Sequence, residues 1–300
     1  MACLESPATT LKAQAVTALK ADHRLEVLLE VAGLARSTFF YHQARLASPD
    51  PRAALKTAIR EVFENNKGRY GHRRVHRELV TAGWRVAKKT VLALMRRLGL
   101  VCLVRRRRRY NSFKGQTSTT GATGKTAPNL LARDFTATAP NRKWVTDVTE
   151  FAIAGRKLYL SPVMDLFDRQ IIAYTTSDSP NLQLTNSSLQ QALTTQRPSP
   201  GLLVHSDQGF QYQHHSWQAL LTTARATQSM SRKANCYDNA IIENFFGHLK
   251  EELFHHTTFT SADAFTTALA DYIHWYNNHR TSTTLKGLSP VQYRTQTLTA

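Results

Sequence analysis

Hydrophobic and polar residues follow two different periods along the chain, and the period changes near residue 140. Before that point, apolar side chains recur every three or four residues, as on one face of an α-helix. Val91, Leu94 and Leu98 show this spacing. Glycines at positions 33 and 83 interrupt the pattern and predict turns between paired helices. The first part of the chain is therefore predicted to be all-α.

After residue 140 the pattern becomes that of an α/β domain. Three β-rich runs with short breaks predict consecutive antiparallel strands over 143–151, 157–167 and 170–176. A short apolar run ending at Asp207 predicts a buried strand. The remaining segments predict a strand near 226–230 and helices over 181–195, 214–224, 239–254 and 261–278. This alternation favours a mixed five-stranded sheet with flanking helices, preceded by small all-α helix-turn-helix-like segments.

Pattern and composition together divide the chain into four expected parts. Residues 1–48 are a helical, helix-turn-helix-like segment, and residues 49–104 are a helix-turn-helix-like DNA-binding domain. Residues 105–139 are a basic linker that includes a stretch rich in Ser, Thr and Gly. Residues 140–300 are the α/β domain with a helical tail at its carboxyl end.

Positive charge is concentrated in the first half. The chain has a net charge of +18, and residues 1–140 hold 26 Lys and Arg against 9 Asp and Glu. Such a segment suits a polyanion, because each phosphate neutralised by Lys or Arg releases counterions. No apolar run approaches the roughly 20 residues needed to span a bilayer, and no signal peptide is recognised at the start. We expect a cytoplasmic, nucleoid-associated protein that binds double-stranded DNA and no membrane.

Basic side chains fall on positions that the helical pattern leaves facing solvent. In the helices around Gly83, the candidate DNA contacts are Arg73, Arg74, Arg77, Lys88 and Lys89. The linker opens with five more, Arg105, Arg106, Arg107, Arg108 and Arg109. Five adjacent like charges cannot all pair internally, which favours phosphate contact. For the helical set, an ordinary solvated face is the alternative.

Two other kinds of ligand site are not supported. The segment GATGKT at 121–126 resembles a phosphate-binding loop, but the required spacing needs glycine at 119, where Thr119 stands. Cys3, Cys102 and Cys236 are isolated from one another, so neither a disulfide framework nor a zinc-binding cysteine pair is expected.

Three acidic residues lie in or beside apolar segments, where an unpaired carboxylate is costly. Asp147 and Asp207 occupy strand positions, and Glu243 borders the apolar stripe of a helix. We predict that they converge to bind two Mg²⁺ ions, for which Mn²⁺ substitutes. Such ions lower the pKa of an attacking water and stabilise the attacking and leaving oxygens of an in-line displacement.

Neighbouring residues refine this prediction. Asn239, Gly247 and Lys250 recur at helical spacing beside Glu243. Gly247 leaves room for a bulky ligand, and Asn239 and Lys250 are candidate DNA contacts. Two further acids lie near the second strand: Asp168 is expected to be structural in a turn, whereas a supporting role for Asp165 stays open.

The acidic segments resemble known motifs. WVTDVTEF at 144–151, HSDQGFQY at 205–212 and DNAIIENFFGHLKEE at 238–252 are similar to those of transposases related to retroviral integrases. The 35 residues between Asp207 and Glu243 match the spacing for which that superfamily is named. With SRKANCYDNA at 231–240, the chain resembles the second-frame, OrfB-type catalytic protein of the insertion-sequence-three family of transposases. Ala234 departs from the glycine usual in that motif.

The resemblance implies a ribonuclease-H-like, retroviral-integrase-like core and Mg²⁺-dependent cleavage at the ends of an insertion element. The freed 3′ hydroxyl then attacks target DNA. It also implies a homo-oligomer on DNA and a first-frame helix-turn-helix partner protein. Two alternatives remain: a non-enzymatic DNA-binding regulator with a degenerate core, and a ribonuclease-H-like nuclease or junction resolvase that cuts without joining.

Overall fold

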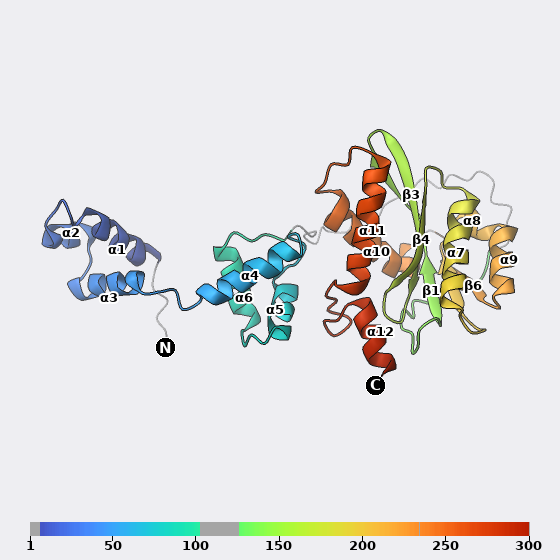
Figure 1. The fold of residues 1–300 in the computed structure, drawn as a ribbon, viewed down its shortest axis with the longest axis horizontal. Helices are drawn as coiled ribbons and strands as arrows, with labels where there is room; N and C mark the ends of the chain where they lie inside the picture. The colour runs from blue at the N-terminus through green and yellow to red at the C-terminus, as the bar shows by residue number, and fades with distance from the viewer. Residues whose placement is uncertain (1–6, 103–125, 234, 300) are drawn as a thin grey trace. The chain divides into compact units, whose positions relative to one another are not determined.

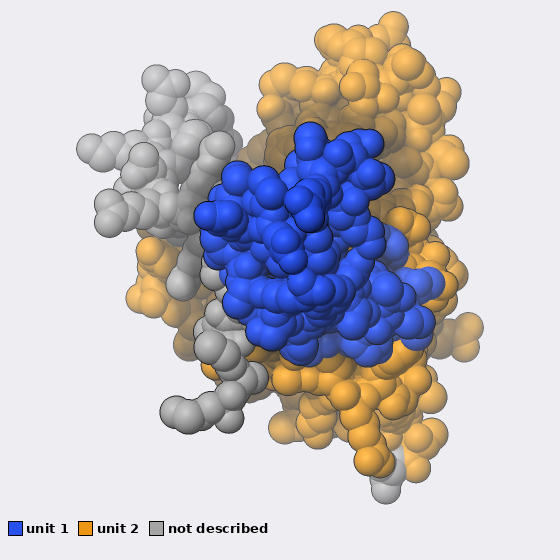
Figure 2. Space-filling model, turned by 90° about the vertical axis from the view of Figure 1, so that its left-hand side faces the viewer, with its two compact units in different colours: residues 1–60 blue, residues 61–300 orange. Residues whose placement is uncertain are grey.

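The chain forms two compact units, residues 1–60 and residues 61–300, coloured separately in Figure 2. This computed structural model describes residues 7–102, 126–233 and 235–299. In the first unit, Leu29 and Phe39 belong to a small apolar core enclosed by three helices. These are α1 (Pro7–Leu19), α2 (Leu25–Ala32) and α3 (Arg36–Ala47). Gly33 ends α2 with a φ of 60°, which confirms the predicted break at this glycine.

Three further helices follow: α4 (Ala53–Asn65), α5 (His72–Thr81) and α6 (Lys88–Arg97). Helices α5 and α6 pack together, as their sequence patterns predict. Val75 and Leu79 of α5 are buried, and so are Val91, Leu94 and Met95 of α6. The apolar face predicted for α6 is therefore confirmed at Val91 and Leu94.

The rest of the second unit is built on a mixed sheet with helices on both faces (Figure 1). The strands are β1 (Lys143–Thr146), β2 (Thr149–Ile153), β3 (Arg156–Asp165), β4 (Ile171–Ser177), β5 (Leu203–Ser206) and β6 (Thr227–Met230). Strand β3 pairs with β1, β2 and β4, while β5 pairs with β1 and β6 pairs with β5. Strand β1 is antiparallel to β3 but parallel to β5. The predicted mixed α/β architecture is confirmed.

One predicted strand, 143–151, is divided into β1 and β2 at Asp147 and Val148. Both halves pair antiparallel with β3, where Thr146 lies opposite Val163 and Thr149 opposite Leu160. Continuing this register places Asp147 opposite Pro162, which has no N–H to donate. The Thr146 hydroxyl instead donates to the Pro162 carbonyl, at 2.8 Å. The ladder is therefore interrupted at the aspartate.

Alternate residues of the strands pack into two separate hydrophobic cores, because successive side chains of a strand point to opposite faces of the sheet. Val145 and Met164 face the core that is shared with the carboxyl-terminal helices α10 (Ala240–Leu249) and α11 (Ala262–Asn278). Trp144 and Val163 face the opposite core. Three helices cover this second face: α7 (Leu182–Gln196), α8 (Phe210–Gln213) and α9 (His215–Thr223).

The helix predicted over 239–254 is composite. A 3₁₀ turn (Cys236–Asn239) leads into α10, and a π-helical turn (Lys250–Phe254) follows it. The last helix, α12 (Pro290–Leu298), opens with a capping box between Ser289 and Gln292. Its Arg294 binds both Asp165 and Asp168, at 2.8 Å for the Asp165 carboxylate. These two acids therefore hold the carboxyl-terminal helix against the turn between β3 and β4.

Leu269 tests the core beneath α11, because its side chain is fully buried against the sheet. We expect Leu269→Ala to lower the free energy of unfolding by about 2–5 kcal/mol, through lost burial and the cavity that remains. Urea unfolding followed by circular dichroism measures the change. Leu298→Ala is the matched control, because Leu298 is 62% exposed, and it should change stability by less than about 0.5 kcal/mol. Equal losses in the two variants would contradict this packing.

Candidate active site

Asp147 and Asp207 lie at the same edge of the sheet because they follow neighbouring parallel strands. Val145 of β1 pairs with His205 of β5, and each aspartate stands two residues beyond its paired residue. Each also accepts a local backbone hydrogen bond, Asp147 from Val148 N at 2.7 Å and Asp207 from Gly209 N at 2.9 Å. The carboxyl ends of parallel strands are a common location for functional side chains.

Glu243 reaches this edge from the first turn of α10. One turn earlier, the Asn239 side-chain amide donates to the Thr146 carbonyl at 3.1 Å. This bond joins the start of α10 to the residue immediately before Asp147. Sequence positions almost a hundred residues apart are thereby held together, and the glutamate is directed toward the two aspartates.

The three carboxylates influence one another electrostatically. The pKa of Asp147 is raised well above its ordinary value, first by loss of hydration and then by the negative charges of Asp207 and Glu243. Loss of hydration also raises the pKa of Asp207. The pKa of Glu243 is raised by loss of hydration and by the charge of Asp207. Like charges held this close favour a bound cation or a bound proton.

The carboxylates surround an accessible site. Asp147 is half-buried, whereas Asp207 and Glu243 are exposed. A Cβ atom added at Gly247, one turn beyond Glu243, would meet no atom within 4 Å. The surface next to the glutamate is therefore open, as predicted for a bulky ligand. Within the described ranges, no group of three or more His, Cys, Asp or Glu side chains is already arranged to hold a metal ion.

Asp238 was not identified from the sequence, yet it fixes the entrance to α10. Its side chain is fully buried and accepts bonds from Arg133 at 2.8 Å and from Arg232 at 2.9 Å. Asn129 donates to it as well, at 2.9 Å. These partners hold the pKa of Asp238 well below its usual range. Arg232 stands only six residues earlier, so the sequence did carry a local signal for this pair.

Tyr212 is a second residue that the sequence pattern did not single out. Its side chain is buried against Trp217, with ring centroids 4.9 Å apart. Burial, followed by the charges of Asp147 and Asp207, raises the pKa of its hydroxyl well above the ordinary value. The phenol therefore lies within the electrostatic influence of both aspartates and stays protonated.

His205 is held by a hydrogen bond at each of its ring nitrogens. Its two ring nitrogens lie 2.8 Å from the Ser229 hydroxyl and 3.0 Å from the Ser231 hydroxyl. Burial lowers the pKa of His205 to about 4, so the ring is neutral at physiological pH. This histidine ties β5 to the strand beside it.

The candidate DNA contacts have different surroundings. Arg73, Arg77, Lys88 and Lys89 are exposed. Arg74 pairs with Glu252 at 3.3 Å. Arg77 lies against Gly287, and a side chain at that position would have to displace the Arg77 side chain.

The candidates near Glu243 are less accessible than their helical spacing suggests. Asn239 is only 3% exposed, and Lys250 is half-buried above the Phe151 ring, 5.5 Å from its centroid. Burial lowers the pKa of Lys250. The arginines of the linker, Arg105, Arg106, Arg107, Arg108 and Arg109, lie outside the described residues. All these DNA contacts stay predictions.

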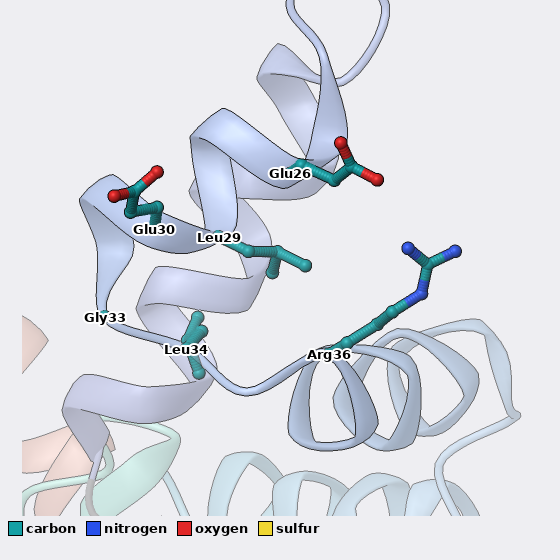
Figure 3. A pocket seen from close by; sticks show the side chains of 6 residues that line it. All are labelled: Glu26, Leu29, Glu30, Gly33, Leu34 and Arg36. Carbon is teal, nitrogen blue, oxygen red and sulfur yellow. The ribbon is translucent and has the colours of Figure 1, made fainter.

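A separate hollow lies in the first unit and contains none of the predicted catalytic residues (Figure 3). Glu26 and Glu30 of α2 and Arg36 of α3 provide its charged side chains.

Across the described ranges, no helix is both long and apolar enough to cross a membrane.

Comparison with known proteins identifies the family. Residues 137–236 and residues 243–298 each match a family described as an integrase core domain, and residues 50–108 match an HTH-like domain. InsK of insertion sequence element IS150 from Escherichia coli is 45% identical over 93% of this chain and 96% of its own length.

Two further relatives are also transposases of insertion sequences. The transposase InsF of insertion sequence IS3A, also from Escherichia coli, is 32% identical over 93% of this chain and 96% of its own length. The probable transposase of insertion sequence element IS1353 from Shigella flexneri is 40% identical over 94% of this chain and 54% of its own length. The chain therefore belongs to the insertion-sequence-three family of transposases and carries that family's integrase core and HTH-like domains.

Proposed function

We propose that this transposase cleaves DNA at the ends of an insertion element and joins the freed 3′ hydroxyl to target DNA, using Asp147, Asp207 and Glu243. The observation that carries this proposal is the convergence of two strand-end aspartates with a glutamate bonded into place through Asn239. An integrase core domain in the chain supports polynucleotidyl transfer.

The site suits Mg²⁺. Carboxylate oxygens are the ligands that this ion prefers, and the pKa values of the three acids are raised, with no basic group among the causes of the shifts. Asp147, Asp207 and Glu243 would hold two ions, with Mn²⁺ as a substitute. When bound, the ions lower the pKa of the attacking water and stabilise the attacking and leaving oxygens.

The protein's own groups position the reaction. The backbone bonds from Val148 and Gly209 orient the two aspartates, while α10 carries Glu243 against them. Bound ions would lie between these three side chains. Open space beside Gly247 leaves room for a DNA strand at the glutamate.

Partners are part of the proposal. The chain would act as a homo-oligomer on double-stranded element ends and target DNA in the cytoplasm. A first-frame helix-turn-helix protein would supply recognition of the element. The IS1353 relative, of which only 54% is matched, supports a fused or additional segment in such systems.

Replacing one acid tests the catalytic assignment. Asp147→Asn, Asp207→Asn and Glu243→Gln should each reduce Mg²⁺-dependent cleavage of element-end DNA by roughly 10²–10³-fold or more, because charge stabilisation at the reacting phosphate is lost. Gel assays measure cleavage, and fluorescence anisotropy verifies that DNA binding persists. Asp271→Asn changes an exposed acid and is the control. Undiminished cleavage in any of the three variants would refute the assignment.

Joining separates a transposase from a nuclease that only cuts. DNA carrying a recessed 3′ hydroxyl should give a joined product with the wild-type chain. Hydrolysis with no such product would favour the nuclease alternative, and DNA binding without either reaction would favour the non-enzymatic regulator.

The raised pKa of Asp147 predicts a stability effect. Ionised Asp147 is disfavoured in the folded chain, so its stabilising contribution is complete below its unfolded pKa and is lost as the pH rises through the folded pKa. Without metal, Asp147→Asn should therefore stabilise the protein at neutral pH, and this advantage should shrink as the pH falls toward about 4. Thermal unfolding across pH measures it.

Adding Mg²⁺ should make the wild type more stable than Asp147→Asn. The ion should raise the melting temperature of the wild type and have a smaller effect on Asp147→Asn, because binding to the folded state stabilises it. Asp271→Asn should respond to Mg²⁺ as the wild type does. An equal Mg²⁺ response in Asp147→Asn would argue against metal binding by this carboxylate.

The arginine run gives a prediction for DNA affinity. Replacing Arg105, Arg106, Arg107, Arg108 and Arg109 by alanine should weaken DNA binding and flatten its salt dependence. The slope of log K against log salt should fall by about 0.9 for each arginine that contacts phosphate in duplex DNA. Anisotropy titrations at several salt concentrations measure this slope. Arg197→Ala, an exposed arginine after α7, is the control, and an unchanged slope in the quintuple variant would exclude the run from DNA contact.

A further inference from the structure

A cavity of about 300 Å³ lies along α10, on a face adjacent to the one that carries Glu243. Ile241, Phe245 and His248 of α10 form one of its walls, and Asn244, the residue after Glu243, borders it as well. Residues three and four apart share a helix face, so this wall runs for two turns beside the catalytic glutamate. We call this space the arginine cavity.

Arginines and hydroxyl groups provide the polar lining of the arginine cavity. Its guanidinium groups come from Arg74 of α5, Arg169 between β3 and β4, and Arg280 after α11. Ser282, Thr283 and Thr284 follow Arg280 along the rim. Among the described residues that line the cavity there is no Asp or Glu. The polar lining is therefore cationic and rich in hydrogen-bond donors.

The charges of two of these arginines are already partly neutralised by Glu252. Glu252 accepts from Arg280 Nη2 at 2.8 Å and from Arg74 Nη1 at 3.3 Å. The pKa of Glu252 is lowered to about 2, because these cations outweigh its burial. Glu252 is therefore ionised, and it offsets part of the positive charge at one end of the cavity.

Arg169 has no such carboxylate. Its Nη2 donates to the Phe135 carbonyl at 2.8 Å, whereas its buried Nη1 has no hydrogen-bond partner in the described part of the chain. The acids beside it in sequence, Asp165 and Asp168, are both bound by Arg294. Within the described ranges Arg169 forms no ion pair. The charges of Asp165 and Asp168 reach Arg169 only from a distance, and a partly buried cation without an ion-pair partner favours binding of an anion.

We propose that the arginine cavity binds a phosphate group of the DNA strand held at α10, with Arg169 as its principal ligand. This proposal rests on the proposed function. Guanidinium groups match the oxygens of phosphate in geometry and charge, and serine and threonine hydroxyls donate to the remaining oxygens. A phosphate anchored beside Glu243 would set the path of the strand over the three carboxylates.

The anion site is tested on the full chain with inorganic phosphate. At matched ionic strength, phosphate should raise the melting temperature of the wild type more than chloride does. Arg169→Gln should lose this difference, and Arg169→Lys should retain part of it because the positive charge remains. Without phosphate, Arg169→Gln should be at least as stable as the wild type, since an uncompensated buried charge has been removed.

A control variant and a second variant of the cavity test whether the phosphate response depends on this site. Arg225→Gln changes an exposed arginine outside the cavity and should keep the full phosphate response. Replacing Ser282 and Thr284 together by alanine removes rim hydroxyls without touching a buried charge, so the response should weaken even if Arg169→Gln does not fold. A wild type that responds equally to phosphate and chloride would overturn the proposal.

Duplex binding then identifies the source of the phosphate. If the ligand is a DNA phosphate, Arg169→Gln should reduce the slope of log K against log salt by about 0.9 relative to Arg225→Gln. An unchanged slope together with a lost phosphate response would show a site for free anions and overturn the DNA assignment. Neither readout requires cleavage, so failure of the catalytic triad would be recognised separately.

Discussion

The mutual repulsion of carboxylates at one sheet edge is the constraint on which the catalytic part of this molecule depends. Asp147 and Asp207 meet there because β1 and β5 are parallel neighbours, and Glu243 joins them because Asn239 is bonded to the Thr146 carbonyl. Three unneutralised acids oppose this arrangement in the absence of a cation. The fold withstands the repulsion because both helical layers bury apolar surface against the sheet.

Buried ionic groups elsewhere secure the elements that carry the acids. Asp238 is bound by arginines at the entrance to α10, while Glu252 is bound by arginines beyond its end. Asp165 and Asp168 fasten α12 through Arg294. Breaking such a pair leaves a charge that is hard to rehydrate, so these contacts favour one arrangement of the helices over looser ones.

The sequence predicts local features well because they depend on neighbouring residues. The α6 face and the strand that ends before Asp207 follow from periodicity and agree with the structure. Contacts between residues distant in sequence are not predicted by local periodicity. Arg74 was placed facing solvent because α5 alone gives no sign of Glu252, which lies 178 residues away. Asn239 shows the same limit, since only the folded sheet brings Thr146 to its side chain.

The interruption between β1 and β2 makes the position of Asp147 depend on a residue of β3. Asp147 stays out of the strand ladder because the residue opposite it, Pro162, has no N–H to offer. The position of this carboxylate thus depends on a residue of another strand that supplies no functional group to the site. A residue at position 162 that carries an N–H would let the backbone pair continuously past Asp147, which would move this carboxylate without replacing any of the three acids.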